Sequence, residues 1–155
     1  MNWKLNDLKK RHGTSILSYL IDTNVLSEIR KGVGADRAVL DWWSSINEND
    51  IHLSVVAMGE VYRGIEKLSR VDPARGKLFL DWIEEVIEAF DGRIIGIDLE
   101  AAVIWGKITS GRSLPLADAL LAATALSRNL TLITRNTRDI HDTGVRYLNP
   151  FVESR

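Results

Sequence analysis

The chain has 155 residues, of which 45% are hydrophobic and 26% are charged, and it carries a formal net charge of −1 and no cysteine. This composition is typical of one folded domain with its own hydrophobic core and argues against disorder. The lack of cysteine excludes disulfide bonds and thiolate chemistry. The near-zero net charge excludes a broadly basic surface that would hold nucleic acid mainly by counterion release.

The start of the chain differs from the rest. Residues 1–14 are largely polar and basic and lack the apolar core of a signal peptide. We expect them to be an N-terminal appendage to a single domain that spans residues 15–155. The longest apolar run, Leu114–Ala123, contains Asp118 and is too short to cross a bilayer. These features predict a cytoplasmic protein that does not enter a membrane.

Short β-rich apolar runs alternate with longer segments of helical period, which predicts an α/β domain with a largely parallel sheet. The predicted strands are Leu17–Ile21, Ile51–Leu53, Arg93–Ile97, Thr131–Ile133 and Val145–Leu148. The predicted helices are about Asn24–Lys31, Asp36–Asn47, Val55–Ser69, Pro73–Phe90, Leu99–Ser110 and Pro115–Asn129. The fourth helix has the clearest period, because its large apolar residues fall on one side.

Four acidic residues lie within apolar stretches or just after them. Asp22 ends an apolar strand, Glu60 and Asp118 interrupt apolar helices, and Asp139 follows the strand at 131–133. A lone carboxylate among hydrophobic groups costs on the order of several kcal/mol unless a cation meets it. No Lys or Arg is spaced to neutralise all four. The simplest interpretation is one shared site in which these carboxylates bind a divalent metal ion.

Two of these residues also have structural interpretations of some weight. Asp22 could cap the helix that follows it, although the carboxyl ends of parallel strands are also where ligands bind. Glu60 could form a weak ion pair with Arg63, one helical turn away. Other acidic residues need only a structural role, because Asp36, Asp72 and Asp98 each open a predicted helix as N-caps.

The other two residues have structural alternatives as well. Asp118 lies in the first turn of its helix, where the helix dipole stabilises a negative charge. Asp139 could cap or close a turn, and the nearby Thr134 and Asn136 could form that turn or orient a water on the metal. The wholly apolar surroundings of Asp118 favour a chemical role for it.

Hard divalent ions such as Mg²⁺ and Mn²⁺ prefer oxygen ligands. Carboxylates around such ions are a common arrangement for phosphodiester hydrolysis, in which the metal activates water and one carboxylate can accept a proton. The chain lacks a phosphate-binding P-loop and a nucleophile elbow, and its three histidines lack zinc-ligand spacing. A basic rim for nucleic acid is possible, although solvated surface charge explains each of its members equally well: Arg63, Lys67, Arg70, Arg112, Arg135 and Arg138.

The order of these motifs resembles the PIN-domain nucleases, and most of all the VapC- and FitB-type toxins of bacterial type II toxin–antitoxin pairs. The resemblance extends from about Ser18 to Phe151. It rests on Leu20–Leu26, on Ser54 with Glu60 and Gly64, on Pro115–Ala119, and on Thr134–Asn136 with Asp139. The chain departs from the family in Ile140, where an aromatic residue is common, and in its N-terminal extension.

The resemblance implies a PIN-like sandwich with a central, mostly parallel five-stranded sheet flanked by helices. It implies an endoribonuclease toxin that depends on Mg²⁺ or Mn²⁺ and cleaves RNA. Asp22, Glu60, Asp118 and Asp139 would be the catalytic and metal-binding quartet, with Asn24, Thr134 and Asn136 in support. It also implies a homodimer and a cognate antitoxin protein that blocks the site.

Two other functions are compatible with parts of the pattern. A non-catalytic PIN-like module would bind nucleic acid or a partner, as in FitB-like DNA binding through an antitoxin, but the presence of all four acids counts against it. A phosphatase of the haloacid dehalogenase type would use a strand-end aspartate as nucleophile. That chemistry usually needs a second aspartate two positions after Asp22, where this chain has Asn24.

Overall fold

The computed structural model describes residues 17–152, so the predicted appendage at 1–14 lies outside the described residues. A five-stranded sheet runs through the centre in the order β3-β2-β1-β4-β5, and every neighbouring pair of strands is parallel. The strands are β1 Tyr19–Ile21, β2 Ile51–Ser54, β3 Ile94–Ile95, β4 Thr131–Ile133 and β5 Tyr147–Leu148. The predicted α/β class and parallel sheet are confirmed.

The six predicted helices are all present, and their ends differ from the predictions by one or two residues, as helix ends commonly do. They are α1 Thr23–Ile29, α2 Arg37–Ser45, α3 Val55–Val71, α4 Pro73–Ala89, α5 Leu99–Thr109 and α6 Leu116–Ser127. The described residues also contain three short 3₁₀ turns: η2 Gly32–Gly34 joins α1 to α2, η3 Glu48–Asp50 precedes β2, and η4 His141–Thr143 lies between β4 and β5. Among residues 17–152, no helix is both long and apolar enough to cross a membrane.

Three strands are shorter than predicted. Leu17, in the predicted strand at 17–21, is 48% exposed and precedes the paired residues of β1. The predicted strands at 93–97 and 145–148 shrink to two residues each, because β3 and β5 are the two edges of the sheet and pair on one side only. An apolar run therefore overestimates an edge strand, since only part of it finds a partner.

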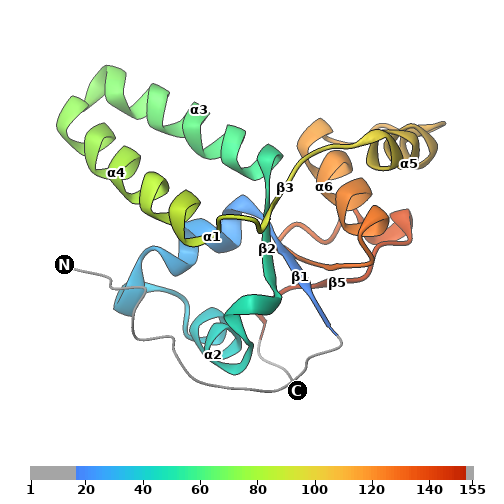
Figure 1. Cartoon of the computed structure of the whole chain (residues 1–155), viewed down its shortest axis with the longest axis horizontal. Helices are drawn as coiled ribbons and strands as arrows, with labels where there is room; N and C mark the ends of the chain where they lie inside the picture. Colours follow the sequence, from blue (N-terminus) through green and yellow to red (C-terminus); the bar gives the residue numbers. More distant parts are fainter. Residues whose placement is uncertain (1–16, 153–155) are drawn as a thin grey trace.

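Alternation along the strands divides the core into two layers. Ile21 and Ile133 face one cluster, which they share with apolar residues of α1, α2, α3 and α4. Leu20 and Leu132 face the other cluster, to which α6 contributes most of the helical residues. Figure 1 shows α3 and α4 as a long pair to one side of the sheet and α5 with α6 on the other. The predicted sandwich is confirmed.

The helix starts depend on polar caps that the sequence predicts. The side chains of Asp36, Asp72 and Asp98 accept hydrogen bonds from backbone N–H groups in the first turns of α2, α4 and α5. Ser54 caps α3 in the same way, at 3.1 Å from the nitrogen of Val56. Because β1, β2 and β4 are parallel, their carboxyl ends lie at the same end of the sheet. The segments that follow these strands begin there, and so does the candidate site.

Candidate functional site

Asp22 lies directly after β1 and is 5% exposed. Its Oδ1 accepts a hydrogen bond from the backbone nitrogen of Thr23 at 2.6 Å, and its Oδ2 accepts one from Asn24 Nδ2 at 2.7 Å. Thr134, at the end of β4, donates its hydroxyl to the same Oδ2 at 2.6 Å. Asp22 therefore serves as the cap of α1 and also holds together the ends of two neighbouring strands.

Thr134 and Asn24 tie the loop after β4 to the start of α1. The buried Thr134 hydroxyl accepts hydrogen bonds from Asn24 Nδ2 at 3.3 Å and from the backbone nitrogen of Asn136 at 3.0 Å. Asn24 Oδ1 accepts from the backbone nitrogen of Arg135 at 3.1 Å. Both residues thus orient Asp22 and fix the loop that carries Asn136 and Asp139.

Glu60, on the second turn of α3, is held by a residue that the sequence analysis did not select. The Thr23 hydroxyl donates to Glu60 Oε2 at 2.8 Å. The predicted alternative, an ion pair with Arg63, is absent from the ion pairs between described residues. The sequence does indicate Thr23 in one respect, because it follows Asp22 after a strand and its hydroxyl therefore lies at the same end of the sheet.

Asp118 and Asp139 meet through Asn136. The Asn136 Nδ2 atom donates to Asp118 Oδ2 at 2.9 Å and to Asp139 Oδ2 at 2.9 Å. Asp118 lies in the first turn of α6, and its side chain is half-buried. The loop after β4 and the start of α6 therefore bring two carboxylates to one amide group.

Electrostatics place all four carboxylates in one neighbourhood. Burial, followed by the negative charges of Asp22, Asp139 and Glu60, raises the pKa of Asp118 to about 6, although the bond from Asn136 opposes the shift. The pKa of Asp22 is also raised, mainly by burial and further by the charge of Glu60, against its hydrogen bonds. Because the charges of the other three carboxylates act on Asp118, the structure brings the predicted quartet together.

No ion pair within residues 17–152 involves any of the four carboxylates. In the same range, no three acidic or histidine side chains stand ready-made as a set of metal ligands. Hydroxyl and amide donors from Thr23, Thr134 and Asn136 meet the carboxylate oxygens instead. The donor set is nevertheless all oxygen with excess negative charge, and this chemistry fits a hard divalent cation such as Mg²⁺ or Mn²⁺.

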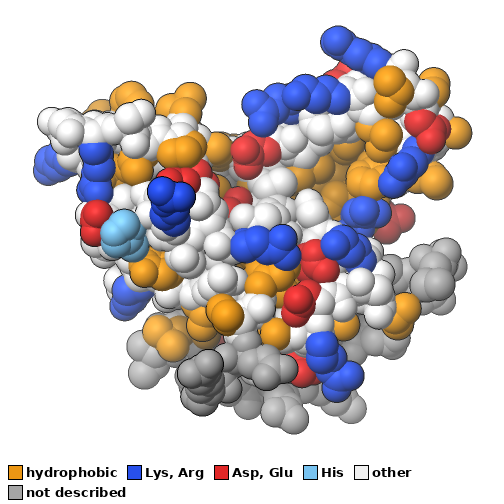
Figure 2. Space-filling model, turned by 180° about the vertical axis from the view of Figure 1, so that it is seen from behind, with side chains coloured by type: hydrophobic (Ala, Val, Ile, Leu, Met, Phe, Trp, Pro, Cys, Tyr) orange, Lys and Arg blue, Asp and Glu red, His pale blue; other side chains and the backbone are white. Residues whose placement is uncertain are grey.

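The six predicted rim cations are all exposed. Arg112 is fixed by its bond to the backbone oxygen of Asp142, at 2.9 Å. Arg135 stacks its guanidinium 3.7 Å from the centre of the Phe151 ring. Figure 2 shows Lys and Arg side chains on both lobes of the molecule, with acidic side chains in the hollow between them. This distribution can attract a polyanion without a high net charge.

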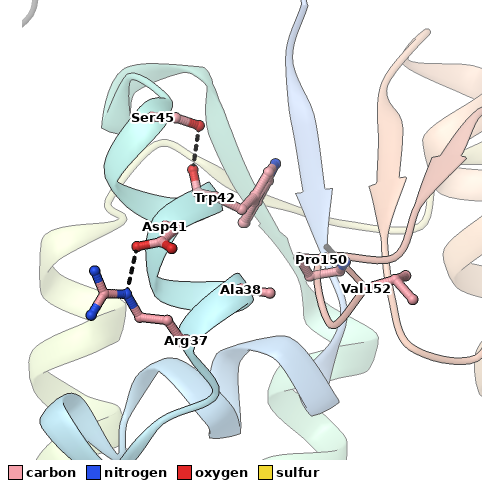
Figure 3. A pocket seen from close by; sticks show the side chains of 7 residues that line it. All are labelled: Arg37, Ala38, Asp41, Trp42, Ser45, Pro150 and Val152. Carbon is pink, nitrogen blue, oxygen red and sulfur yellow. Dashed lines mark hydrogen bonds and ion pairs between the residues drawn. The ribbon is translucent and has the colours of Figure 1, made fainter. Parts of the chain in front are cut away.

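A second hollow, of about 430 Å³, lies between α2 and the C-terminal segment (Figure 3). Arg37, Asp41, Trp42 and Pro150 are among its lining residues, and Arg37 is paired with Asp41 at 2.9 Å. None of the four carboxylates lines this hollow. It is therefore separate from the candidate site.

Comparison with known proteins agrees with this arrangement. The family model of the PIN domain matches residues 19–145. A VapC ribonuclease of Sinorhizobium fredii is 32% identical over 140 residues, which cover 85% of this chain and 96% of that protein. The toxin FitB of Neisseria gonorrhoeae is 30% identical over 138 residues, which cover 85% of this chain and 97% of that protein. Among solved structures, FitAB bound to the IR36 DNA fragment superposes with a TM-score of 0.79 at 28% identity, over 88% of this chain and 98% of that one.

Proposed function

This chain belongs to the PIN-domain family, and from that membership we propose that it is a divalent-cation-dependent endoribonuclease that acts as the toxin of a toxin–antitoxin pair. The observation that carries the proposal is the cluster of Asp22, Glu60, Asp118 and Asp139. The charges of its other three members raise the pKa of Asp118, and the charge of Glu60 raises that of Asp22. No ion pair among the described residues offsets this repulsion. A folded protein keeps such a cluster at a cost to stability, and function explains why.

The four carboxylates would hold the cation, Mg²⁺ or Mn²⁺, at the carboxyl ends of β1 and β4. When bound, the ion supplies Lewis-acid activation of a water and charge stabilisation at the phosphodiester. Burial and the neighbouring carboxylates raise the pKa of Asp118 to about 6 in the metal-free protein, and a bound cation would favour the ionised form that serves as a ligand. Asn24, Thr134 and Thr23 orient Asp22 and Glu60 through the bonds described above.

The RNA backbone would approach the cluster between the two basic lobes (Figure 2). Among the six rim residues, Arg112 and Arg135 have the best-defined side chains. Arg112 is bonded to a backbone oxygen, and Arg135 is stacked on the Phe151 ring. Phosphate contacts of this kind position a nucleic acid without reading its sequence.

We further propose a cognate antitoxin and a homodimer, both acting in the cytoplasm. The relative FitB occurs in a solved complex, FitAB, which is bound to DNA. In this chain, Leu99 and Val103 of α5 and Leu116 of α6 are large apolar side chains that remain exposed, at 81%, 48% and 62%. Such residues supply apolar surface for a partner chain.

The direct test incubates antitoxin-free protein with total cellular RNA in Mg²⁺ or Mn²⁺ and maps the new RNA ends. Chelation with EDTA and the variant Asp118→Asn should each abolish discrete ends. Asp41→Asn is the matched control, because Asp41 is an exposed helical acid that pairs with Arg37, away from the cluster. Cleavage that persists in EDTA or in Asp118→Asn contradicts the proposal. No cleavage by folded wild-type protein favours a non-catalytic nucleic-acid-binding module.

A further inference from the structure

One amide group lies between two carboxylates of the cluster. Asn136 Nδ2 is 2.9 Å from Asp118 Oδ2 and 2.9 Å from Asp139 Oδ2. The position of Asn136 is fixed independently, since its backbone nitrogen donates to the buried Thr134 hydroxyl at 3.0 Å. The side chain therefore reaches the pair from a loop that is itself bonded to the end of β4.

The chemistry of the three groups explains this contact. Ionised carboxylates accept hydrogen bonds and cannot donate them, so Asp118 and Asp139 repel each other unless a donor or cation separates them. A primary amide nitrogen carries two N–H groups and can serve both oxygens at once. A divalent cation held by these carboxylates would supply the positive charge for which the amide N–H groups now stand in.

We propose that Asn136 is a positioning residue whose amide substitutes for the divalent cation between Asp118 and Asp139 and gives up this position when the cation binds. The amide keeps the two carboxylates together in the metal-free protein and so preserves the site until loading. The inference rests on the proposed function only in taking these carboxylates as cation ligands. It assigns to Asn136 a role in metal loading rather than contact with RNA.

This role has a definite sign. If the cation displaces the amide from the two Oδ2 atoms, binding to the wild type breaks two hydrogen bonds. Binding to Asn136→Ala breaks none and relieves a less favourable metal-free state. Asn136→Ala should therefore bind Mn²⁺ about threefold to tenfold more tightly, the range expected for loss of one or two charge-assisted hydrogen bonds. Asn136→Leu, which has a similar shape but can neither donate a hydrogen bond nor bind a cation, should show a similar gain.

The experiment titrates Mn²⁺ into the full chain without RNA and follows the loss of the free-ion paramagnetic resonance signal. Wild type, Asn136→Ala and Asn136→Leu are compared with Asn49→Ala, which removes an exposed asparagine side chain far along the chain. Thermal melts in EDTA and in saturating Mn²⁺ accompany each titration. The two Asn136 variants should melt earlier than wild type in EDTA and gain more from Mn²⁺, and Asn49→Ala should match wild type in both.

Unchanged or weaker Mn²⁺ binding by both Asn136 variants overturns the inference, because the amide would then be a bystander or a group that stays in place to support the ion. That result leaves the proposed nuclease intact if wild type still binds Mn²⁺ and cleaves RNA. Absence of saturable Mn²⁺ binding by wild type overturns both proposals. If Asn136→Ala shows no cooperative melt, Asn136→Leu, which is closer to asparagine in shape, carries the comparison.

Discussion

Glu28 and the clustered acids differ in the direction of their pKa shifts, because their surroundings differ. Glu28, on α1, is 8% exposed, and its Oε2 accepts from Lys31 Nζ at 2.7 Å while its Oε1 accepts from the backbone nitrogen of Asp36 at 2.8 Å. The Lys31 bond, the Asp36 bond and nearby positive charge lower the pKa of Glu28 despite its burial. Asp22, which precedes the same helix by one residue, has a raised pKa. On α6, the pKa of Asp118 rises to about 6.

The comparison separates structure from function. Glu28 gains from being ionised in the folded state, because a cation and a backbone donor compensate it, and it joins α1 to the start of α2. Asp22 and Asp118 lose by being ionised, so folding alone does not explain why they are there. Acids with a raised pKa and acidic neighbours are therefore candidate ligands for a cation, whereas a buried acid with its own cation has a structural role in joining two segments.

The largest expected effect is on catalysis. Asp118→Asn preserves shape but removes one charge from the proposed cation site, and turnover should fall by roughly 10²-fold or more. Substitution of residues that only hydrogen-bond to metal ligands already lowers affinity or activity by roughly 10–100-fold. Glu28→Gln is the matched substitution at the compensated acid, and its activity should stay close to that of the wild type. Single-turnover RNA cleavage with both proteins at equal concentration measures the difference. Equal losses in the two variants would remove the distinction between these acids.

The next effect is on stability, and here the substitution of Glu28 should have the large effect. Glu28→Ala leaves the Asp36 N–H without its acceptor and Lys31 without its partner, so the free energy of unfolding should fall by about 1–3 kcal/mol. The loss should be the same in EDTA and in Mg²⁺, because Glu28 is not a proposed ligand. Urea unfolding in both buffers measures it, with the exposed Glu66→Ala as control. A loss that appears only in Mg²⁺ would contradict a purely structural role for Glu28.

The clustered carboxylates were easier to select from the sequence than the buried Glu28. Asp22, Glu60 and Asp118 were recognisable because each interrupts an apolar stretch, and the parallel order of β1, β2 and β4 determines where they converge. Glu28 was missed because its neighbours, Lys31 three positions on and Arg30, make it resemble an ordinary solvated surface charge. Its burial depends on the turn of η2, which returns the chain so that the Asp36 backbone meets it.

Contacts between distant segments account for the remaining differences. The sequence suggested Arg63 as a partner of Glu60, since both lie on one helix, but the observed partner is Thr23, 37 positions away. Likewise the bond from Asn136 to Asp118 joins residues 18 positions apart, through a loop whose path no local pattern specifies. Edge strands were overestimated for a related reason, because pairing depends on neighbours along the sheet rather than along the chain.

A smaller effect is expected at Thr23, which connects the backbone after β1 to Glu60. Thr23→Val keeps the shape and removes the hydroxyl donor, which should lower turnover by roughly fivefold, the equivalent of about 1 kcal/mol for one hydrogen bond. Thr23→Ser retains the hydroxyl and should restore most of the activity. RNA cleavage at saturating Mg²⁺ compares the three proteins. Full activity in Thr23→Val would mean that Glu60 needs no help to be positioned.

The smallest effect is a pH dependence of stability in EDTA, and its sign distinguishes the two kinds of acid. The pKa of Asp118 rises on folding from 3.8 to about 6, so its charge opposes folding fully above pH 6, and the penalty disappears as the folded protein takes up a proton between pH 6 and pH 4. Glu28, whose pKa is lowered, contributes stability above its unfolded value of 4.5 and loses it only as the pH falls further. Asp118→Asn should therefore be more stable than wild type at pH 7, with an advantage that shrinks as the pH falls from 7 to 5. Thermal melts of both proteins across that range measure the difference, and Glu28→Gln should show no such narrowing. An advantage of Asp118→Asn that does not change between pH 7 and pH 5 would mean that the wild-type carboxyl stays ionised in both the folded and the unfolded protein. Its pKa would then not be raised by folding, and repulsion within the cluster would not be the source of its cost.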